Sequence, residues 1–247
     1  MKTAIIIPSR LGSTRLPRKP LHMIAGMTLV ERVYRGCKRA HGIEYIAVAT
    51  DSVEIADHVR AFGGEVIMTP ESCETGTERV GIAAQSLPED IDVVINVQGD
   101  EPLIDPIVLD TLRDLFEISP GVRIATPITP LLDDAELANP AVVKVALSRD
   151  NRALYFSRSP IPFDRDGADL VDYWQHIGVY AFRKKNLQQI LELPPCPLER
   201  AEKLEQLRWL DAGYSIHCVN VEYRSVAVDT AEDVEKVEAI LRERGEA

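Results

Sequence analysis

The sequence predicts an α/β fold in which helices flank a mixed, mostly parallel β-sheet. Short apolar runs alternate with helical stretches of about ten or more residues, the pattern of strand-helix-strand units. Polar and charged residues directly follow two of these runs, where ligands bind in open α/β sheets. An apolar content of 45% in 247 residues suits a globular core, and 27% charged residues argues against disorder. We expect one domain over residues 1–247, with an inserted subregion at about 124–182.

The first half of the chain alternates regularly. The β-branched run that ends at Pro8 is typical of a buried strand that leads into a loop. Ser52 is expected to cap a helix that ends at Gly63-Gly64, and Pro106 suits the first turn of another helix. The expected strands are 4–7, 45–50, 65–68 and 92–97, and the expected helices are 28–40, 52–62, 77–86 and 106–118.

Beyond residue 121 the pattern is less regular. Leucine and alanine recur at three-residue steps between residues 198 and 210, which predicts an amphipathic helix over 197–211. Residues 226–228 are interpreted as a strand, and Thr230 with Asp233 resembles a capping box that begins a final helix. The other expected strands are 124–129, 142–147, 177–182 and 216–219.

Composition excludes several classes of protein. A net charge of −11 and a pI near 5.0 argue against a nucleic-acid partner, because such proteins generally carry a broad basic face. No segment approaches 18 uncharged apolar residues, so we expect no membrane insertion. The short apolar run before Pro8 does not fit a secretory signal, and together these features predict a cytoplasmic enzyme. The four cysteines are scattered, so neither a disulfide framework nor a zinc site is expected.

Cations gather in the loop after the first strand. The loop carries four cations, Arg10, Arg15, Arg18 and Lys19, and three hydroxyls, Ser9, Ser13 and Thr14. Arginine and lysine supply charge, while hydroxyls and backbone N–H groups supply further donors, so the loop suits a polyphosphate. An exposed basic loop is the alternative, but it does not explain why so many cations cluster in a chain of net charge −11. We therefore predict an anion site.

A second signal follows the apolar run at 92–97. Asp100 lies just past this run, at the sheet edge that the cationic loop shares. It is placed to hold Mg²⁺ against a triphosphate, since Mg²⁺ prefers one or two carboxylates plus phosphate oxygens. Gln98 is suited to hydrogen-bond a polar substrate. A turn in which Gly99 and Asp100 only end the strand explains these residues equally well.

Two further segments have both a structural and a functional interpretation. Asp229 is either a helix cap or a second Mg²⁺ ligand, and spacing alone does not show that it meets Asp100. The segment from Thr75 to Arg79 opens a helix, whose amides and hydroxyls suit a ribose or a base, with Arg79 reaching a phosphate. A plain helix N-cap is the competing interpretation.

These pieces together resemble one family over nearly the whole chain, the 3-deoxy-manno-octulosonate (Kdo) cytidylyltransferases. The matching runs are IIIPSRLGSTRLPRKPL, VATD, TGTERV, VINVQGDEP, NPAVVKV, ALYFSRSPIPFDRD, HIGVYAFR, PLERAEKLEQLRWL and VDTAEDVEKV. The first and the fourth of these runs are shared more loosely with other nucleotidyltransferases.

The resemblance implies a nucleotide-diphosphosugar-transferase (Rossmann-like) domain that forms a homodimer. It implies Mg²⁺-dependent transfer of CMP from CTP to the anomeric hydroxyl of Kdo, giving CMP-Kdo and pyrophosphate for lipopolysaccharide biosynthesis. The catalytic residues it implies are Arg10, Lys19, Asp100 and Asp229, of which Asp100 and Asp229 hold the metal. The implied nucleotide-binding residues are Pro8, Arg10, Ser13, Lys19, Thr75, Gly76, Thr77 and Arg79. The implied sugar-binding residues are Gln98, Arg158, Arg165, His176, Tyr180, Glu205 and Gln206.

Two positions depart from the family pattern. Arg18 stands where the L-P-G-K-P motif has Gly, and Ala227 stands near a position where Gly is common. Two other functions are kept as alternatives. One is cytidylyl transfer to 8-amino-Kdo or another sugar acid, and the other is a catalytically silent nucleotide-binding protein. Lys19, Asp100 and Asp229 argue against the silent protein, whereas the preference for CTP comes from the resemblance alone.

Overall fold

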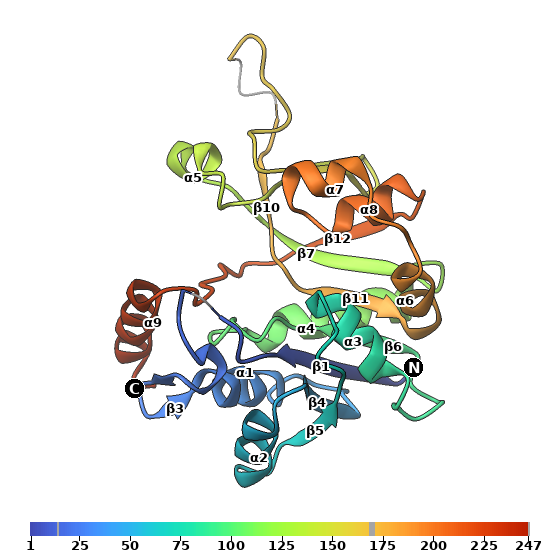
Figure 1. Cartoon of the computed structure of the whole chain (residues 1–247). Coiled ribbons are helices and arrows are strands. Elements are labelled where there is room, and N and C mark those ends of the chain that lie inside the picture. The colour runs from blue at the N-terminus through green and yellow to red at the C-terminus, as the bar shows by residue number, and fades with distance from the viewer. Residues whose placement is uncertain (14, 168–170, 247) are drawn as a thin grey trace. The chain divides into compact units, whose positions relative to one another are not determined.

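The computed structural model describes residues 1–13, 15–167 and 171–246, so Thr14 of the cationic loop lies outside the described residues. Contacts divide the chain into two compact units, Met1–Asp110 with Arg224–Ala247, and Thr111–Tyr223 (Figure 1). The single domain with a subregion at 124–182 stays a prediction, and the second unit extends beyond that subregion on both sides. No helix in the described ranges is long and apolar enough to cross a membrane.

The first unit is built on four parallel strands in the order β5-β4-β1-β6. Its central strand is β1, whose residues from Ala4 to Ile7 are fully buried. Because the strands are parallel, their carboxyl ends share one edge, where Ser9 ends β1 and Asn96 ends β6. The strands confirm the four predicted ones: β1 (Thr3–Ser9), β4 (Tyr45–Thr50), β5 (Glu65–Met68) and β6 (Val93–Asn96).

Hydroxyl side chains begin most helices of this unit. Thr28, Ser52, Thr75 and Thr230 each accept a hydrogen bond from the backbone N–H three residues later, which satisfies an otherwise unpaired helix donor. Thr230 also forms the predicted capping box. The helices are η1 (Lys19–Leu21), α1 (Leu29–Cys37), α2 (Val53–Ala61), α3 (Gly76–Ala84), α9 (Ala231–Arg244) and α4 (Pro106–Ile118), which continues into the second unit.

A short hairpin was not among the predicted elements. β2 (Met23–Ile24) pairs antiparallel with β3 (Met27–Thr28). Its two turn residues, Ala25 and Gly26, both have positive φ, at 43° and 82°. Positive φ at both loop residues is typical of a two-residue hairpin. The hairpin was not predicted because an alanine in the sequence does not indicate a positive φ.

The second unit is organised around β7 (Ile124–Pro130). β10 and β11 pair antiparallel with its two halves along one edge, and β12 pairs parallel along the other (Figure 1). β8 joins β10 to β9. The other elements are α5 (Asp134–Ala138), β8 (Lys144–Leu147), β9 (Ala153–Ser157), β10 (Trp174–His176), β11 (Tyr180–Arg183), α6 (Lys184–Leu191), α7 (Pro197–Glu202), α8 (Gln206–Asp211) and β12 (Ile216–Asn220).

The predicted strand at 177–182 is confirmed only in its second half, as β11, because residues 177–179 form an interruption between β10 and β11. Thr126 of β7 explains the interruption. Its Oγ1 lies 3.2 Å from the carbonyl oxygen of Ile177 and 2.8 Å from that of Val179, so those carbonyls turn towards a side chain. The neighbouring Pro127 has no N–H to continue the ladder.

The predicted helix at 197–211 is helical at both ends but breaks at 203–205 into α7 and α8, and the predicted strand at 226–228 is wrong. Lys203 has a φ of 54° and ends α7, and Arg208 on α8 donates to Glu199 on α7 at 2.8 Å, which folds the second helix back on the first. The apolar periodicity continues across this break, so the pattern alone did not show it. Residues 226–228 pair with no strand among the described residues, although Val228 is buried.

Candidate functional site

A cavity of about 360 Å³ opens in the first unit at the carboxyl edge of its parallel strands. Its volume lies within the roughly 300–1,000 Å³ range usual for small-molecule sites. It contains all but Thr77 of the predicted nucleotide-binding residues, together with Gln98, Asp100 and Asp229. Thr77 is buried in α3 and lies outside this lining. Ser9 and Arg15 of the predicted anion loop also line it, and the lining residues that the sequence did not assign to a site are Gly12, Pro20, Cys73, Glu74 and Gly99.

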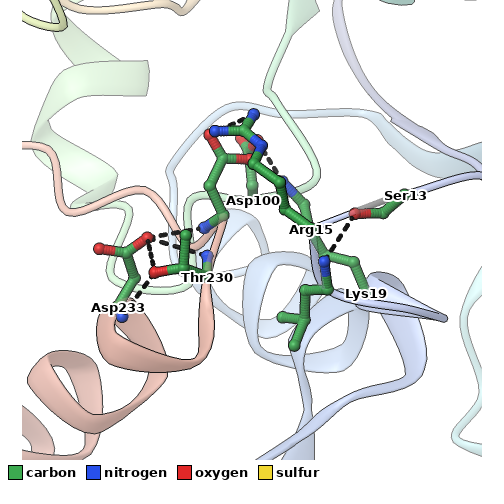
Figure 2. A network of polar contacts seen from close by, with 8 residues as sticks. Ser13, Arg15, Lys19, Asp100, Thr230 and Asp233 are labelled. Atoms are coloured by element: carbon green, nitrogen blue, oxygen red, sulfur yellow. Dashed lines mark hydrogen bonds and ion pairs between the residues drawn. The ribbon is translucent and has the colours of Figure 1, made fainter.

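Lys19 is the centre of this site (Figure 2). Its Nζ lies 2.7 Å from Oδ2 of Asp100 and 2.9 Å from Oδ1 of Asp229. Only 15% of the Lys19 side chain is exposed, so its charge is partly removed from water. Burial lowers the pKa of this ammonium, but the carboxylates of Asp100 and Asp229 outweigh burial and raise the pKa above its usual value. The two carboxylates predicted to hold a metal therefore converge on one point.

Backbone contacts bring Asp229 to Asp100 from the other end of the chain. The N–H of Val228 donates to the carbonyl oxygen of Asp100 at 2.9 Å. Oδ2 of Asp233 then accepts from the N–H groups of Asp229 and Thr230, at 3.1 and 3.0 Å (Figure 2). The N-cap of α9 is Thr230, so the interpretation of Asp229 as the helix cap is wrong, although the capping box holds its backbone. Its role as a Mg²⁺ ligand stays a prediction.

Cations from the loop complete the electrostatics of the site. Arg15 lies 3.0 Å from Oδ2 of Asp229, the oxygen that Lys19 does not contact. The Arg10 side chain is exposed and has no partner among the described residues. Arg18 has a φ of 57°, the left-handed region that favours the glycine of the family motif, and its guanidinium pairs with Glu54 at the start of α2. The loop thus presents Arg10 and Lys19 to a ligand while Arg18 is bound to the scaffold.

Gly99 brings two parts of the site into close contact. A Cβ at this position would lie 2.7 Å from the carbonyl oxygen of Pro8, closer than real Cβ atoms approach a backbone atom. Glycine is therefore required where the chain after β6 passes the end of β1. This close approach places Gln98 and Asp100 beside the cationic loop. Gly99 is the sequence signal that could have predicted it.

Arg79 has a structural role that sequence reasoning did not assign. Its side chain is 3% exposed and contacts Asp51 at 2.8 Å and Oγ1 of Thr69 at 2.5 Å. Two of its guanidinium nitrogens are thereby bound within the unit. Thr75 is an N-cap, as the competing interpretation held, and its helix presents Gly76 to the cavity.

The remaining predicted sugar-binding residues belong to the second unit. His176 and Tyr180 are buried and their rings lie 5.3 Å apart, with Trp209 of α8 at 4.9 Å from Tyr180. Burial raises the pKa of the Tyr180 hydroxyl, and Glu205 raises it further. The Tyr180 hydroxyl and Nε2 of Gln206 are buried without a hydrogen-bond partner among the described residues. Oδ1 of Asn186 and Nδ1 of His217 in the same unit are likewise buried without a partner there, and such groups are costly unless a ligand or water binds them.

The two predicted arginines differ in their surroundings. Arg158 donates from Nε to the carbonyl oxygen of Glu202 at 2.8 Å and from Nη1 to that of Pro140 at 2.9 Å. Arg165 is 90% exposed and lies 4.0 Å from its neighbour Asp166. Arg158 is therefore held in place, whereas Arg165 extends into solvent.

Three comparisons place this geometry among known proteins. A profile of the cytidylyltransferase family matches residues 4–216. The 3-deoxy-manno-octulosonate cytidylyltransferase of Myxococcus xanthus is 48% identical over 244 residues, which are 99% of this chain and 98% of the relative. That of Acidobacterium capsulatum is 45% identical and covers 97% of this chain and 96% of the relative. A solved CMP:2-keto-3-deoxy-manno-octonic acid synthetase complexed with CTP is similar with a TM-score of 0.94 at 40% identity, covering 99% of this chain and all of that one.

His176 makes folding stability depend on pH. Burial lowers its pKa to about 3, against about 6.5 when unfolded. Because the unfolded chain then binds a proton that the folded imidazole does not, stability is lost as pH falls below about 6.5. We expect this residue to remove about 2 kcal/mol of unfolding free energy between about pH 7 and pH 5. Urea unfolding of the wild type and His176→Gln measures it, with the exposed His41→Gln as control. An equal loss in wild type and His176→Gln contradicts the assignment.

Proposed function

Since this chain belongs to the 3-deoxy-manno-octulosonate cytidylyltransferase family, we propose that the Lys19 cavity is its CTP site and that Asp100 and Asp229 hold Mg²⁺ there. The chain transfers CMP from CTP to the anomeric hydroxyl of Kdo and releases pyrophosphate. One observation carries the site assignment. The Lys19 ammonium bridges Asp100 and Asp229 at the strand edge where α/β proteins bind their ligands.

The chemistry of the donors fits Mg²⁺. The oxygens of Asp100 and Asp229 converge on one ammonium, and Mg²⁺ prefers one or two carboxylates with phosphate oxygens and water. No cluster of three acidic, histidine or cysteine ligands is found in the described residues, so the triphosphate would supply the other ligands. When bound, Mg²⁺ supplies charge neutralisation at the phosphates and acidifies a coordinated hydroxyl.

The residues of the chain position and neutralise the reactants. The transfer requires in-line attack by the sugar hydroxyl on the α-phosphorus, and such reactions depend on alignment and on stabilising phosphate charge. Lys19 and Arg10 would bind the triphosphate, with Ser13 as a further donor. Lys19 exchanges its two carboxylate contacts for phosphate contacts as the nucleotide enters, which keeps its buried charge compensated at each stage.

The second unit supplies donors suited to a sugar acid. The Tyr180 hydroxyl and the Gln206 amide, both buried and unsatisfied within the described residues, would bind sugar hydroxyls. His176, Glu205 and the arginines at 158 and 165 complete the set, with the arginines suited to a carboxylate. CMP-Kdo made here would serve lipopolysaccharide biosynthesis in the cytoplasm.

Substrate specificity is tested by measuring pyrophosphate release with paired nucleotides and sugar acids. We expect release from CTP with Kdo, and little from UTP, ATP or GTP with the same sugar. Faster turnover of 8-amino-Kdo than of Kdo would identify 8-amino-Kdo, instead of Kdo, as the preferred substrate. No release from any pair, with CTP still bound, would identify a silent nucleotide-binding protein and contradict the proposal.

The metal role of Asp100 is tested by Asp100→Asn. The change keeps the shape of the side chain but removes a charge worth several kcal/mol to a bound metal, so kcat should fall at least about 100-fold. Folding should persist, because the Val228 contact uses the Asp100 backbone. Asp90→Asn is the matched control, since Asp90 pairs with Lys2 on the surface. Near-normal turnover of Asp100→Asn over a Mg²⁺ titration would contradict the role.

Tyr180→Phe separates a sugar contact from a structural one. Losing one hydrogen bond to the sugar should raise the KM for Kdo about three- to tenfold and leave the KM for CTP unchanged. Stability should not fall, since the Tyr180 hydroxyl has no partner among the described residues. Tyr214→Phe is the control in the same unit. Unchanged kinetics in both variants would remove Tyr180 from the sugar site.

A homodimer is the assembly that we propose from the family. Large apolar side chains are exposed in the second unit, including Phe163 at 84% and Leu132 at 81%. Exposed apolar side chains such as these are suited to an interface between copies if they form a contiguous patch. Light scattering should give twice the 27.5 kDa of one chain, and Phe163→Asp should weaken association. A monomeric mass at micromolar concentration would contradict the proposal.

A further inference from the structure

Lys144 is a fully buried cation whose role the sugar and nucleotide assignments do not explain. Its side chain at the start of β8 is 0% exposed. The ammonium donates to three backbone carbonyl oxygens, of Asn139 at 2.9 Å, Val142 at 2.7 Å and Arg158 at 2.5 Å. All three of its N–H donors are thus used. Burying an ammonium is costly, and an apolar side chain at this position would avoid that cost.

The position of Lys144 connects two strands that carry predicted sugar-binding residues. Its Cα pairs with Ser157 in β9 on one side and with Gln175 in β10 on the other. Arg158 directly follows β9, and His176 ends β10. The N–H of His176 donates to the carbonyl oxygen of Val143 at 2.9 Å. A shift of Lys144 would therefore move Arg158 and His176 together.

Glu202 holds Arg158 from the opposite side. Its Oε2 accepts from the backbone N–H of Arg158 at 2.9 Å, and its Oε1 accepts from Oγ of Ser157 at 2.6 Å. The Arg158 backbone is thus bound at its N–H by Glu202 and at its carbonyl by Lys144. Nε and Nη1 of Arg158 are bound to carbonyl oxygens, and Nη2 has no hydrogen bond to the described residues. Within this group of three side chains, Lys144 and Arg158 carry two positive charges against the single negative charge of Glu202.

We propose that Lys144 is a positioning residue for the sugar acid, because its buried ammonium fixes the backbone and thereby the guanidinium of Arg158. The inference rests on the proposed function, in which Arg158 binds the acid. A lysine with a structural role only would lower stability when removed, without a selective effect on one substrate. Lys144 differs in that its loss would weaken binding of the sugar acid and spare CTP.

The test compares two carbonyl-bound cations of the second unit. Lys144→Met removes the charge and keeps the length of the side chain. Arg183→Met is the matched control, since the Arg183 guanidinium donates to the carbonyl oxygens of Phe116 and Val122, at 2.9 and 3.3 Å, and Arg183 is not a predicted sugar-binding residue. Steady-state pyrophosphate release gives both KM values for each variant, and thermal unfolding gives its stability.

We expect Lys144→Met to raise the KM for the sugar acid about tenfold while the KM for CTP changes less than about twofold. Arg183→Met should lower stability and leave both KM values unchanged. Equal effects of the two variants on both KM values, or normal sugar KM in folded Lys144→Met, would overturn the inference.

A Lys144→Met variant that does not fold and a wild-type protein that is inactive lead to different conclusions. If Lys144→Met fails to fold, Glu202→Gln decides, because it removes the charge that holds Arg158 from the other side. A selective rise in its sugar KM supports the inference, and unchanged kinetics overturns it. If the wild-type protein releases no pyrophosphate from CTP with any sugar acid, the proposed function is wrong and this inference falls with it.

Discussion

The contact of one ammonium with two carboxylates organises the cavity of the first unit. Lys19, Asp100 and Asp229 are far apart in the sequence, yet each has a short polar contact with another of the three. A half-buried lysine is stable as a cation only beside negative charge, and two carboxylates at one point repel each other unless a cation lies between them. The same physical requirement therefore orders both the loop and the end of the chain. It also prepares a site that a metal and a polyphosphate can take over.

The backbone makes this arrangement rigid. Val228 hydrogen-bonds to Asp100, the capping box of α9 binds the Asp229 amide, and Gly99 lets the chain after β6 pass the end of β1. None of these contacts involves a charged side chain of the Lys19 group directly. Substitutions at such positions would disturb the site through geometry rather than through charge. Arg18 adds a comparable constraint in the loop, since its left-handed backbone is accompanied by an ion pair to Glu54.

The second unit follows a different physical rule, the satisfaction of buried polar groups. Lys144 uses its three donors on carbonyl oxygens, and His176 lies 3.0 Å from Oγ1 of Thr126. The Tyr180 hydroxyl and the Gln206 amide are exceptions, buried and unsatisfied within the described residues, as are Oδ1 of Asn186 and Nδ1 of His217. A folded protein tolerates such groups where a ligand completes them.

The sequence by itself determined the α/β class, the parallel strands of the first unit, and most residues of the cavity. In the first half of the chain, apolar runs that end in Pro, Gly or charged residues marked the strand ends, and parallel strands place those ends at one edge. The sequence did not show that Asp229 reaches Asp100, that Arg79 binds Asp51 and Thr69, or that the helix at 197–211 breaks at Lys203. Only the tertiary structure decided these points. Each depends on a contact between residues distant along the chain or on a left-handed backbone at a residue other than glycine, and neither leaves a mark in local periodicity.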